Sequence, residues 1–268
     1  MKLLFLATTA TALFSTAAPV FSDTVFDRMA PGESKRVEIS LRARIGPLEL
    51  ARGTFNATIT PESYQADATY RTSGIGAALS NDAGQTRSRG NVVRGSLRPT
   101  TFNNQESTGK RRRIDMSWGG GSVRAASNPP WGTNMGQPPA TDAQKIEAVD
   151  PLTGLMQLSL LTGRGEGKAC GGVVKIFDGK RRYDIRTQYV GPTTVSTPAY
   201  QGPAIRCTGQ YVEVAGFKAK KPGEKAEPIK LVLILADIGG MGVSVPVRMQ
   251  ASVKGITGTL YAERVTIR

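Results

Sequence analysis

The chain of 268 residues contains no histidine. This absence excludes Ser-His-Asp and Cys-His catalysis and imidazole-ligated metal sites. Proton transfer near neutral pH would then need a carboxylate, a lysine or a tyrosine with a shifted pKa. The nearest carboxylate pair, Asp178 and Asp184, belongs to a predicted turn and a predicted strand, so a carboxylate-dependent glycan hydrolase is an alternative without support. We predict no catalytic residue, no metal and no cofactor.

Long apolar runs are confined to the first residues of the chain. Lys2 precedes the run Leu3–Phe14, and Val20–Ser22 has the small and branched residues of a cleavage site. The run is too short to span a bilayer comfortably. We predict a signal peptide over residues 1–22, cleaved near Ser22, and a periplasmic protein without a transmembrane segment in the mature chain. An N-terminal membrane anchor is the alternative.

Cysteine is scarce, with Cys170 and Cys207 as the two representatives. An even pair in an exported protein usually forms a disulfide. In the chain-entropy model, closing a loop across this separation stabilises the fold by about 4 kcal/mol. A paired redox or metal site is the alternative, and the wide spacing without a nearby thiol or histidine disfavours it.

The charge is strongly positive, with 35 lysines and arginines against 21 acidic residues. Removal of residues 1–22 takes away Lys2 and leaves a net charge of +13. For an exported protein this balance indicates envelope anions, namely phospholipid headgroups, lipopolysaccharide or cell-wall polymers, and not nucleic acid. A basic surface without a specific ligand is the alternative.

Apolar and polar residues alternate through the mature chain. The segments "KRVEISLRARI" (35–45), "GTFNATIT" (53–60), "SYQADATY" (63–70) and "SVPVRMQASVK" (244–254) each place apolar residues at every second position. This period is typical of half-buried antiparallel strands. Such runs predict about a dozen strands in a mainly β single domain over residues 23–268, folded as a curled antiparallel sheet or a barrel-like structure.

Two segments depart from this period. "DPLTGLMQLSLLTG", at about 150–163, predicts one amphipathic helix with Asp150 as N-cap and Pro151 in the first turn. "SGIGAALS" (73–80) predicts a second helix of one or two turns. The Pro/Gly-rich stretch at about 126–145 predicts a long loop.

The densest stretch is "CGGVVKIFDGKRRYDI" (170–185). Asp178-Gly179 between two alternating runs predicts a hairpin, because the type I′ turn needs positive φ at both central residues. The signature residues Asp178, Gly179, Tyr183 and Asp184 then mark the turn and the second strand. We expect the tyrosine face to pack inward and the Arg182–Asp184–Arg186 row to face solvent or an anionic partner. A charged face that is merely solvated is the alternative.

A second basic cluster, "GKRRRIDMSW", covers residues 109–118. This cluster indicates either an anion-binding site or a charged strand edge that prevents aggregation. Tryptophan could support a sugar ring or a lipid headgroup beside such cations. The candidate anion- or ligand-binding residues are therefore Arg111, Arg112, Arg113, Lys180, Arg181, Arg182, Arg186, Trp118 and Trp131.

A family resemblance rests on several of these motifs. "DPLTGLMQLSLL", "FDGKRRYDI", the cysteine of "IRC" and "VPVRMQASVKGITGTL" resemble an uncharacterised family of exported proteobacterial proteins, the domain of unknown function number 3108. The resemblance implies export and a β fold, and it implies no activity. The plan of a curled sheet closed by a helix is loosely similar to carriers of the LolA/LolB type, in architecture alone.

These observations support a non-catalytic periplasmic envelope protein. The first hypothesis is that a sheet-lined cavity with a basic rim holds a lipid or another amphiphile. The second is a structural envelope protein whose basic strands contact cell-wall or lipopolysaccharide anions. The sequence leaves the oligomeric state open.

Overall fold

The structure is a computed structural model that describes residues 26, 29–132, 136, 138–160, 170, 172–218, 229–240 and 244–268. The predicted signal peptide at 1–22 lies outside these residues. The strands of the described part are β1 Lys35–Ile45, β2 Leu48–Ile59, β3 Ser63–Thr72, β4 Ala83–Val93, β5 Ser96–Glu106, β6 Arg113–Gly119, β7 Ser122–Asn128, β8 Gly172–Phe177, β9 Arg182–Thr197, β10 Tyr200–Ala215, β11 Ile229–Asp237, β12 Ser244–Val253 and β13 Ile256–Ile267.

All of these strands belong to one antiparallel sheet with the order β7-β6-β5-β4-β3-β2-β1-β13-β12-β11-β10-β9-β8. Consecutive strands pair as hairpins, and β1 pairs with β13 to join the two halves of the chain. The apolar positions of the alternating runs point to the core, where Val37, Ile59 and Val245 are completely buried. The prediction of a mainly β fold with one curled sheet of about a dozen strands is confirmed.

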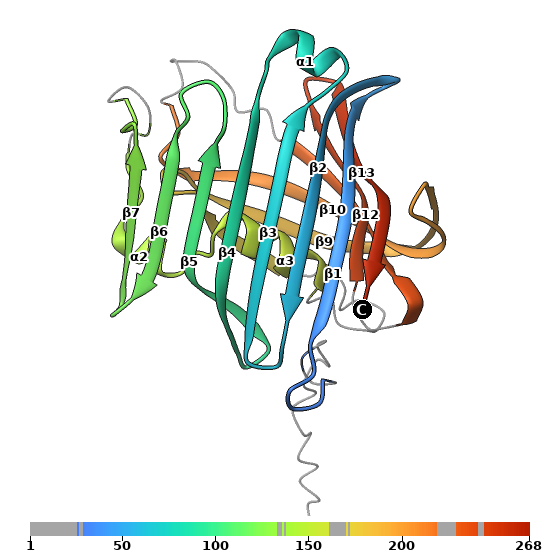
Figure 1. The fold of residues 1–268 in the computed structure, drawn as a ribbon, viewed down its shortest axis with the longest axis horizontal. Coiled ribbons are helices and arrows are strands. Elements are labelled where there is room, and N and C mark those ends of the chain that lie inside the picture. Colours follow the sequence, from blue (N-terminus) through green and yellow to red (C-terminus); the bar gives the residue numbers. More distant parts are fainter. Residues whose placement is uncertain are drawn as a thin grey trace, which may run out of the picture.

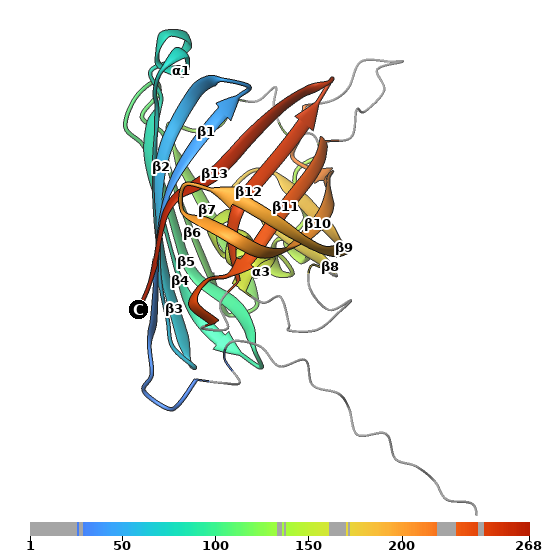
Figure 2. The same ribbon diagram turned by 90° about the vertical axis from the view of Figure 1, so that its right-hand side faces the viewer.

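The sheet curls until its two halves face each other. In Figure 1, β9 and β10 run across behind β1–β5, and α3 (Pro151–Leu160) lies between the two layers. Figure 2 shows the same curl from the side. The edge strands β7 and β8 are not paired with each other in the described part, so the structure is barrel-like without being a closed barrel.

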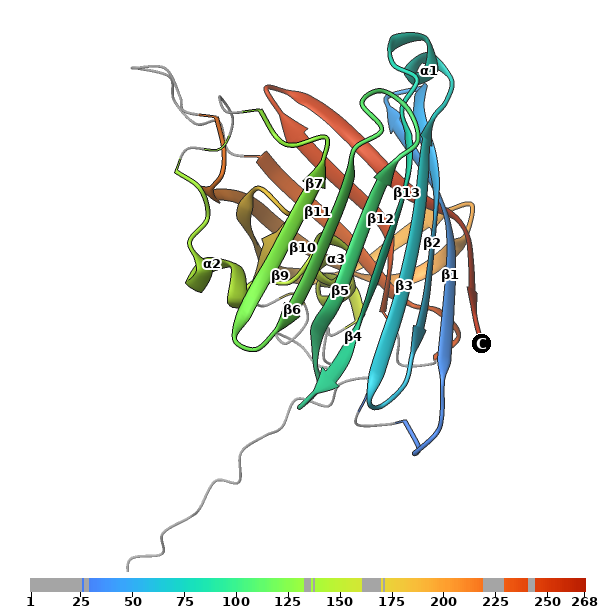
Figure 3. The same ribbon diagram turned by 60° about the vertical axis from the view of Figure 1, so that its left-hand side comes forward.

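The segment before α3 covers the gap between the two edges. Val149 pairs in parallel with Ile176 of β8, and its amide donates to the carbonyl of Lys175 at 2.9 Å. On the other side, Trp118 of β6 donates its indole N–H to the carbonyl of Ala148 at 3.2 Å. In Figure 3, α2 (Asp142–Ile146) lies at the left beside β7, at this edge of the sheet. The segment thus bridges the opening of the curled sheet.

The described part of the chain also contains three α-helices. The predicted helix at 150–163 is present as α3, with residues 161–163 outside the described part, and the predicted short helix at 73–80 is α1, Ile75–Leu79. The expectation of one long loop over 126–145 was wrong at both ends, because β7 extends to Asn128 and α2 begins at Asp142. The missed signal was the capping box of Thr141 and Gln144, in which each side chain bonds the backbone amide of the other residue. A 3-10 turn, η2, covers Ile238–Gly240.

The β8–β9 hairpin exists as predicted, but its turn is longer. Phe177 pairs with Arg182, so residues 178–181 form a four-residue loop. Asp178 organises the loop, because its carboxylate accepts hydrogen bonds from the backbone amides of Lys180 at 2.9 Å and Arg181 at 2.6 Å. Gly179 has φ +93°, whereas Asp178 does not have positive φ. The two-residue turn expected from Asp-Gly was therefore wrong.

The expected orientation of β9 was wrong as well. Arg182 is 2% exposed and Asp184 is 8% exposed, so this part of the ionic row is buried and does not face solvent. Tyr183, on the other strand face, is half-buried and stacks on Tyr211 at 4.7 Å between ring centroids. Both faces of β9 are covered at this point. Arg186 is the exposed member of the row.

Candidate anion-binding site

The space between the two layers is filled mainly by α3. Leu152 and Met156 are buried in the main core. An apolar pocket remains beside the helix, between Leu155, Phe55 and Met249, and it has room for about one water molecule, on the order of 10 Å³. The described strands and α3 therefore leave no space in this pocket for a lipid chain.

A buried polar network fixes α3 in this place. Asp150 caps the helix by accepting from the amides of Leu152 and Thr153, each at 2.9 Å. Its other oxygen contacts the hydroxyls of Ser88 at 2.8 Å and Thr153 at 2.5 Å, and Tyr64 contacts the Thr153 hydroxyl at 2.7 Å. Burial raises the pKa of Asp150, and these hydrogen bonds oppose the rise only in part. The network ties α3 to β3 and β4, and we assign it a structural role.

Three of the predicted ligand-binding residues meet at the opening of the sheet. Arg112 directly precedes β6, Trp131 lies three residues beyond β7, and Lys180 belongs to the β8–β9 turn. We call Arg112, Trp131 and Lys180 the seam cluster. Gly179 permits the meeting, because a Cβ there would lie 2.6 Å from Cγ2 of Ile114 on β6. A glycine at this position lets the turn pack against β6.

The two cations of the seam cluster share one indole ring. The guanidinium carbon of Arg112 lies 3.9 Å from the Trp131 ring centroid, and Nζ of Lys180 lies 4.8 Å from it. Both distances are typical of cation–π contacts. Arg112 is 8% exposed, and its Nε donates to the carbonyl of Pro129 at 3.1 Å.

The seam cluster has donors without acceptors. Nζ of Lys180 and Nε1 of Trp131 are buried, and neither has a hydrogen-bond partner among the described residues. In the same part of the chain, neither Arg112 nor Lys180 forms an ion pair with a carboxylate. Desolvation lowers the pKa of Lys180, the charges of Arg181 and Arg112 lower it further, and the charge of Asp178 opposes the decrease only in part. Because a buried polar group without a partner is costly, this arrangement suits an anionic group that brings oxygen acceptors.

The other residues predicted in these two clusters are exposed or have partners elsewhere. Arg113 points outward and pairs with Asp115 at 2.7 Å, and Arg181 lies over the Phe217 ring at 5.7 Å. Arg111 is exposed in the β5–β6 turn. The indole N–H of Trp118 is bonded internally to the backbone, so it is not available to a ligand.

Arg182 and Arg186 belong to a separate ion network. Arg182 donates to Asp184 at 2.5 Å and to Glu147 at 3.2 Å, and Glu147 also pairs with Lys175 at 2.5 Å. Arg186 lies 3.8 Å from Asp184. The hydrogen bond from Lys175, followed by the charges of Lys175 and Arg182, lowers the pKa of Glu147. These cations are neutralised within the protein, so they are poor candidates for an external anion.

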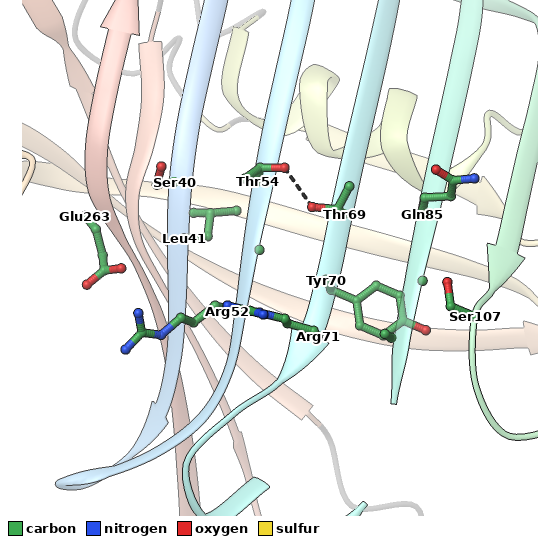
Figure 4. Close-up of a pocket in the computed structure, with 13 residues that line it drawn as sticks. Ser40, Leu41, Arg52, Thr54, Thr69, Tyr70, Arg71, Gln85, Ser107 and Glu263 are labelled. Atoms are coloured by element: carbon green, nitrogen blue, oxygen red, sulfur yellow. Dashed lines mark hydrogen bonds between the residues drawn. The ribbon is translucent and has the colours of Figure 1, made fainter. Parts of the chain in front are cut away.

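The outer face of the sheet holds a second concave feature that sequence reasoning missed. Figure 4 draws residues of a shallow trough across β13 and β1–β4, among them Arg52, Thr69 and Arg71. The trough has a volume of about 480 Å³. The Tyr70 side chain lies on the opposite face of β3, in register with the buried Tyr64 and Ala66, and its ring lies over Gly84.

Most charge in this trough is internally balanced. Arg52 bonds Glu49 at 2.8 Å and holds the pKa of that carboxylate at about 2, and Arg42 pairs with Glu263. Thr54 and Thr69 share a hydrogen bond of 2.8 Å, as drawn in Figure 4. A second trough of about 450 Å³ crosses β4–β6 and is lined by Arg87, Arg89 and Arg113 among others.

The cysteines lie where a disulfide can form. The Cα atoms of Cys170 and Cys207 are 5.9 Å apart, within the usual range for a bridge. Cys207 is completely buried on β10 and packs with Leu233 and Leu235. The described residues contain no cluster of three metal-ligating side chains and no helix with the length and apolarity to cross a bilayer.

Solved structures resemble this chain in overall shape at low sequence identity. A β-barrel-like protein of the domain of unknown function DUF1849 from Brucella abortus has a TM-score of 0.48 and 11% identity, over 88% of this chain and 98% of that one. A "putative lipoprotein" from Parabacteroides distasonis has a TM-score of 0.36 and 12% identity, over 91% and 99% of the two chains. No curated protein matches the chain in sequence.

One family model matches most of the chain. The family described as "Protein of unknown function (DUF3108)" covers residues 38–263, so the chain belongs to it. The match extends from β1 to β13 and includes all three residues of the seam cluster.

Proposed function

We propose that this member of the DUF3108 family is a non-catalytic envelope protein that binds an anionic group at the seam cluster. One observation carries the proposal: the buried donors of Lys180 and Trp131 have no acceptor among the residues that the structure describes, and Arg112 adds a second cation beside them. The expected ligand carries a phosphate or a carboxylate. The apolar run at residues 3–14 supports export of the protein to the periplasm, where such groups occur on lipid headgroups and on envelope polymers.

The chemistry of the site favours a small multivalent anion over a single neutral ligand. Oxygen atoms of a phosphate can accept from the Lys180 ammonium, the Arg112 guanidinium and the Trp131 indole at the same time. The bound charge also offsets the repulsion between Arg112 and Lys180 that lowers the lysine pKa. The seam cluster consists of an amine, a guanidinium and an indole and has no pair of carboxylates, and we assign it a binding role.

Tryptophan fluorescence tests the proposal directly. The chain has two tryptophans, and a Trp118→Phe background leaves Trp131 as the reporter. We expect a saturable change in its emission on titration with inorganic phosphate, with glycerol phosphate and with dispersed phosphatidylglycerol. A response to the phospholipid alone identifies a lipid headgroup, whereas an equal response to all three identifies the phosphate group itself.

The matched variants separate binding from general charge effects. Lys180→Met should weaken the response about tenfold or more, because it removes a buried charged donor. Arg113→Gln removes one charge from an exposed, internally paired arginine nearby and should leave the response unchanged. No saturable response, or equal titration curves for Lys180→Met and Arg113→Gln, would refute the proposal.

A second candidate function is contact with an anionic envelope polymer across the outer face of the sheet. The trough over β4–β6 favours it, because Arg89 lines the trough as an exposed cation, whereas Arg87 and Arg113 there pair with Asp67 and Asp115. Cosedimentation with lipopolysaccharide should then decrease when Arg87 and Arg89 are changed together to Gln. Unchanged cosedimentation would exclude this face.

A further inference from the structure

One end of the curled sheet exposes large apolar side chains on three separate connections. They are Ile45 and Leu48 at the β1–β2 turn, Ile75 and Leu79 in α1, and Val253 and Ile256 at the β12–β13 turn. We call these six residues the apolar rim. Leu79 is 78% exposed and Ile256 is 59% exposed.

The three connections lie together in space. Figures 1 and 2 show α1, the β1–β2 turn and the β12–β13 turn at the same end of the molecule. Ile45 pairs with Gly258, two residues beyond Ile256, which places the two hairpin tips side by side. The amide of Ser73, just before α1, donates to the carbonyl of Leu50 on β2 at 2.9 Å, which joins α1 to the first hairpin.

The six side chains of the apolar rim are left exposed by the described part of the molecule. Scattered apolar residues are normal on a protein surface, whereas several that converge on one end mark a contact surface. Gly76 seats α1 closely on β2, since a Cβ there would lie 2.0 Å from the Leu50 carbonyl oxygen. The backbone of α1 is thus held against the sheet, while Ile75 and Leu79 remain exposed.

Cations accompany the apolar rim. Lys254 occupies the β12–β13 turn with φ +51°, and Lys110 and Arg111 are exposed in the β5–β6 turn at the same end. Arg71, near the end of β3 and before α1, is exposed too. Among acids at this end, Glu49 is bonded to Arg52. Apolar side chains flanked by cations are the composition of surfaces that insert shallowly into anionic bilayers.

We infer that the apolar rim docks the protein onto an anionic phospholipid bilayer, with the six side chains in the interfacial region and the neighbouring cations at the headgroups. This docking does not depend on the seam cluster, and either can exist without the other. The seam cluster follows the β5–β6 turn through Arg112, so docking would bring it toward the headgroups.

Vesicle cosedimentation with the full mature chain tests the inference. We expect the protein to bind phosphatidylcholine vesicles that contain about 30% phosphatidylglycerol, and to bind vesicles of pure phosphatidylcholine much more weakly. The double variant Leu79→Ser/Ile256→Ser should lower the partition coefficient about tenfold or more, and Lys254→Glu should lower it in a salt-sensitive way. The matched control is Val190→Ser on β9, an apolar residue that is 55% exposed outside the apolar rim.

The outcomes separate this inference from the proposed function. Because the changed residues are exposed, thermal unfolding should be unaffected in all variants. Loss of vesicle binding with an intact Trp131 response to inorganic phosphate supports docking by the apolar rim. Equal partitioning of the rim variants and Val190→Ser overturns the inference. It is also overturned if the wild type binds no vesicles but forms a concentration-dependent dimer in sedimentation that Leu79→Ser/Ile256→Ser abolishes.

Discussion

Removal of the Arg182 guanidinium is expected to destabilise the protein more than any single change on the surface of β9. Arg182 is 2% exposed and donates to the carbonyls of Gln144 at 3.2 Å and Tyr183 at 2.8 Å, in addition to its carboxylate partners. In Arg182→Ala, Asp184 would remain buried, with Arg186 at 3.8 Å as its remaining cationic neighbour among the described residues. Breaking a buried ion pair in this way costs about 3–5 kcal/mol.

Urea unfolding followed by circular dichroism measures this loss. The matched control is Arg186→Ala, which removes a side chain that is 57% exposed and should cost about 1 kcal/mol or less. The double variant Arg182→Ala/Asp184→Ala should lose less than the sum of the two single variants, because it leaves no buried charge unpaired. If Arg182→Ala and Arg186→Ala lower the free energy of unfolding equally, the assignment of a buried ion pair on β9 is wrong.

Two further changes test other parts of the core. Because burial raises the pKa of Asp150, the folded protein binds the proton of this carboxyl more tightly than the unfolded chain does. The contribution of Asp150 to the free energy of unfolding therefore falls as pH rises above 3.8, the ordinary pKa of an aspartate. Urea midpoints at pH 4 and pH 7 should therefore show that Asp150→Asn, which keeps a capping oxygen, loses less stability over this interval than the wild type; an identical pH dependence would contradict the raised pKa. Thiol titration of denatured, unreduced protein from the periplasm should find no free thiol at Cys170 or Cys207, and reduction should lower the free energy of unfolding by about 4 kcal/mol. Two titratable thiols would disprove the bridge.

Local sequence signals were sufficient for most elements of the fold. Alternation predicted the strands because a half-buried antiparallel strand repeats every two residues. Asp150-Pro151 predicted the start of α3, because a capping carboxylate and a fixed φ act within one turn. The turn at Asp178-Gly179 was located correctly but its length was not, because the side-chain bonds of Asp178 to two amides favour a four-residue loop.

The position of α3 could not be read from the sequence. Its leucine spacing predicts an amphipathic helix, and such a helix can cap a barrel or fill it. The hydroxyls of Ser88 on β4 and Tyr64 on β3 decide between these arrangements by bonding Asp150 and Thr153 between the layers. These contacts join residues more than sixty positions apart, and no local pattern records them.

The sequence by itself determined that the chain is β-rich and basic, that it carries one cysteine pair, and that its cations gather in two clusters. The tertiary structure decided which cations meet. Arg112 and Lys180 lie on opposite edges of the sheet order, and the curl accumulated over all the intervening strands brings them to one indole ring. The same curl covers both faces of β9 and buries Arg182. A period of two residues distinguishes the faces of a strand, but only the packing of distant elements decides which face meets water.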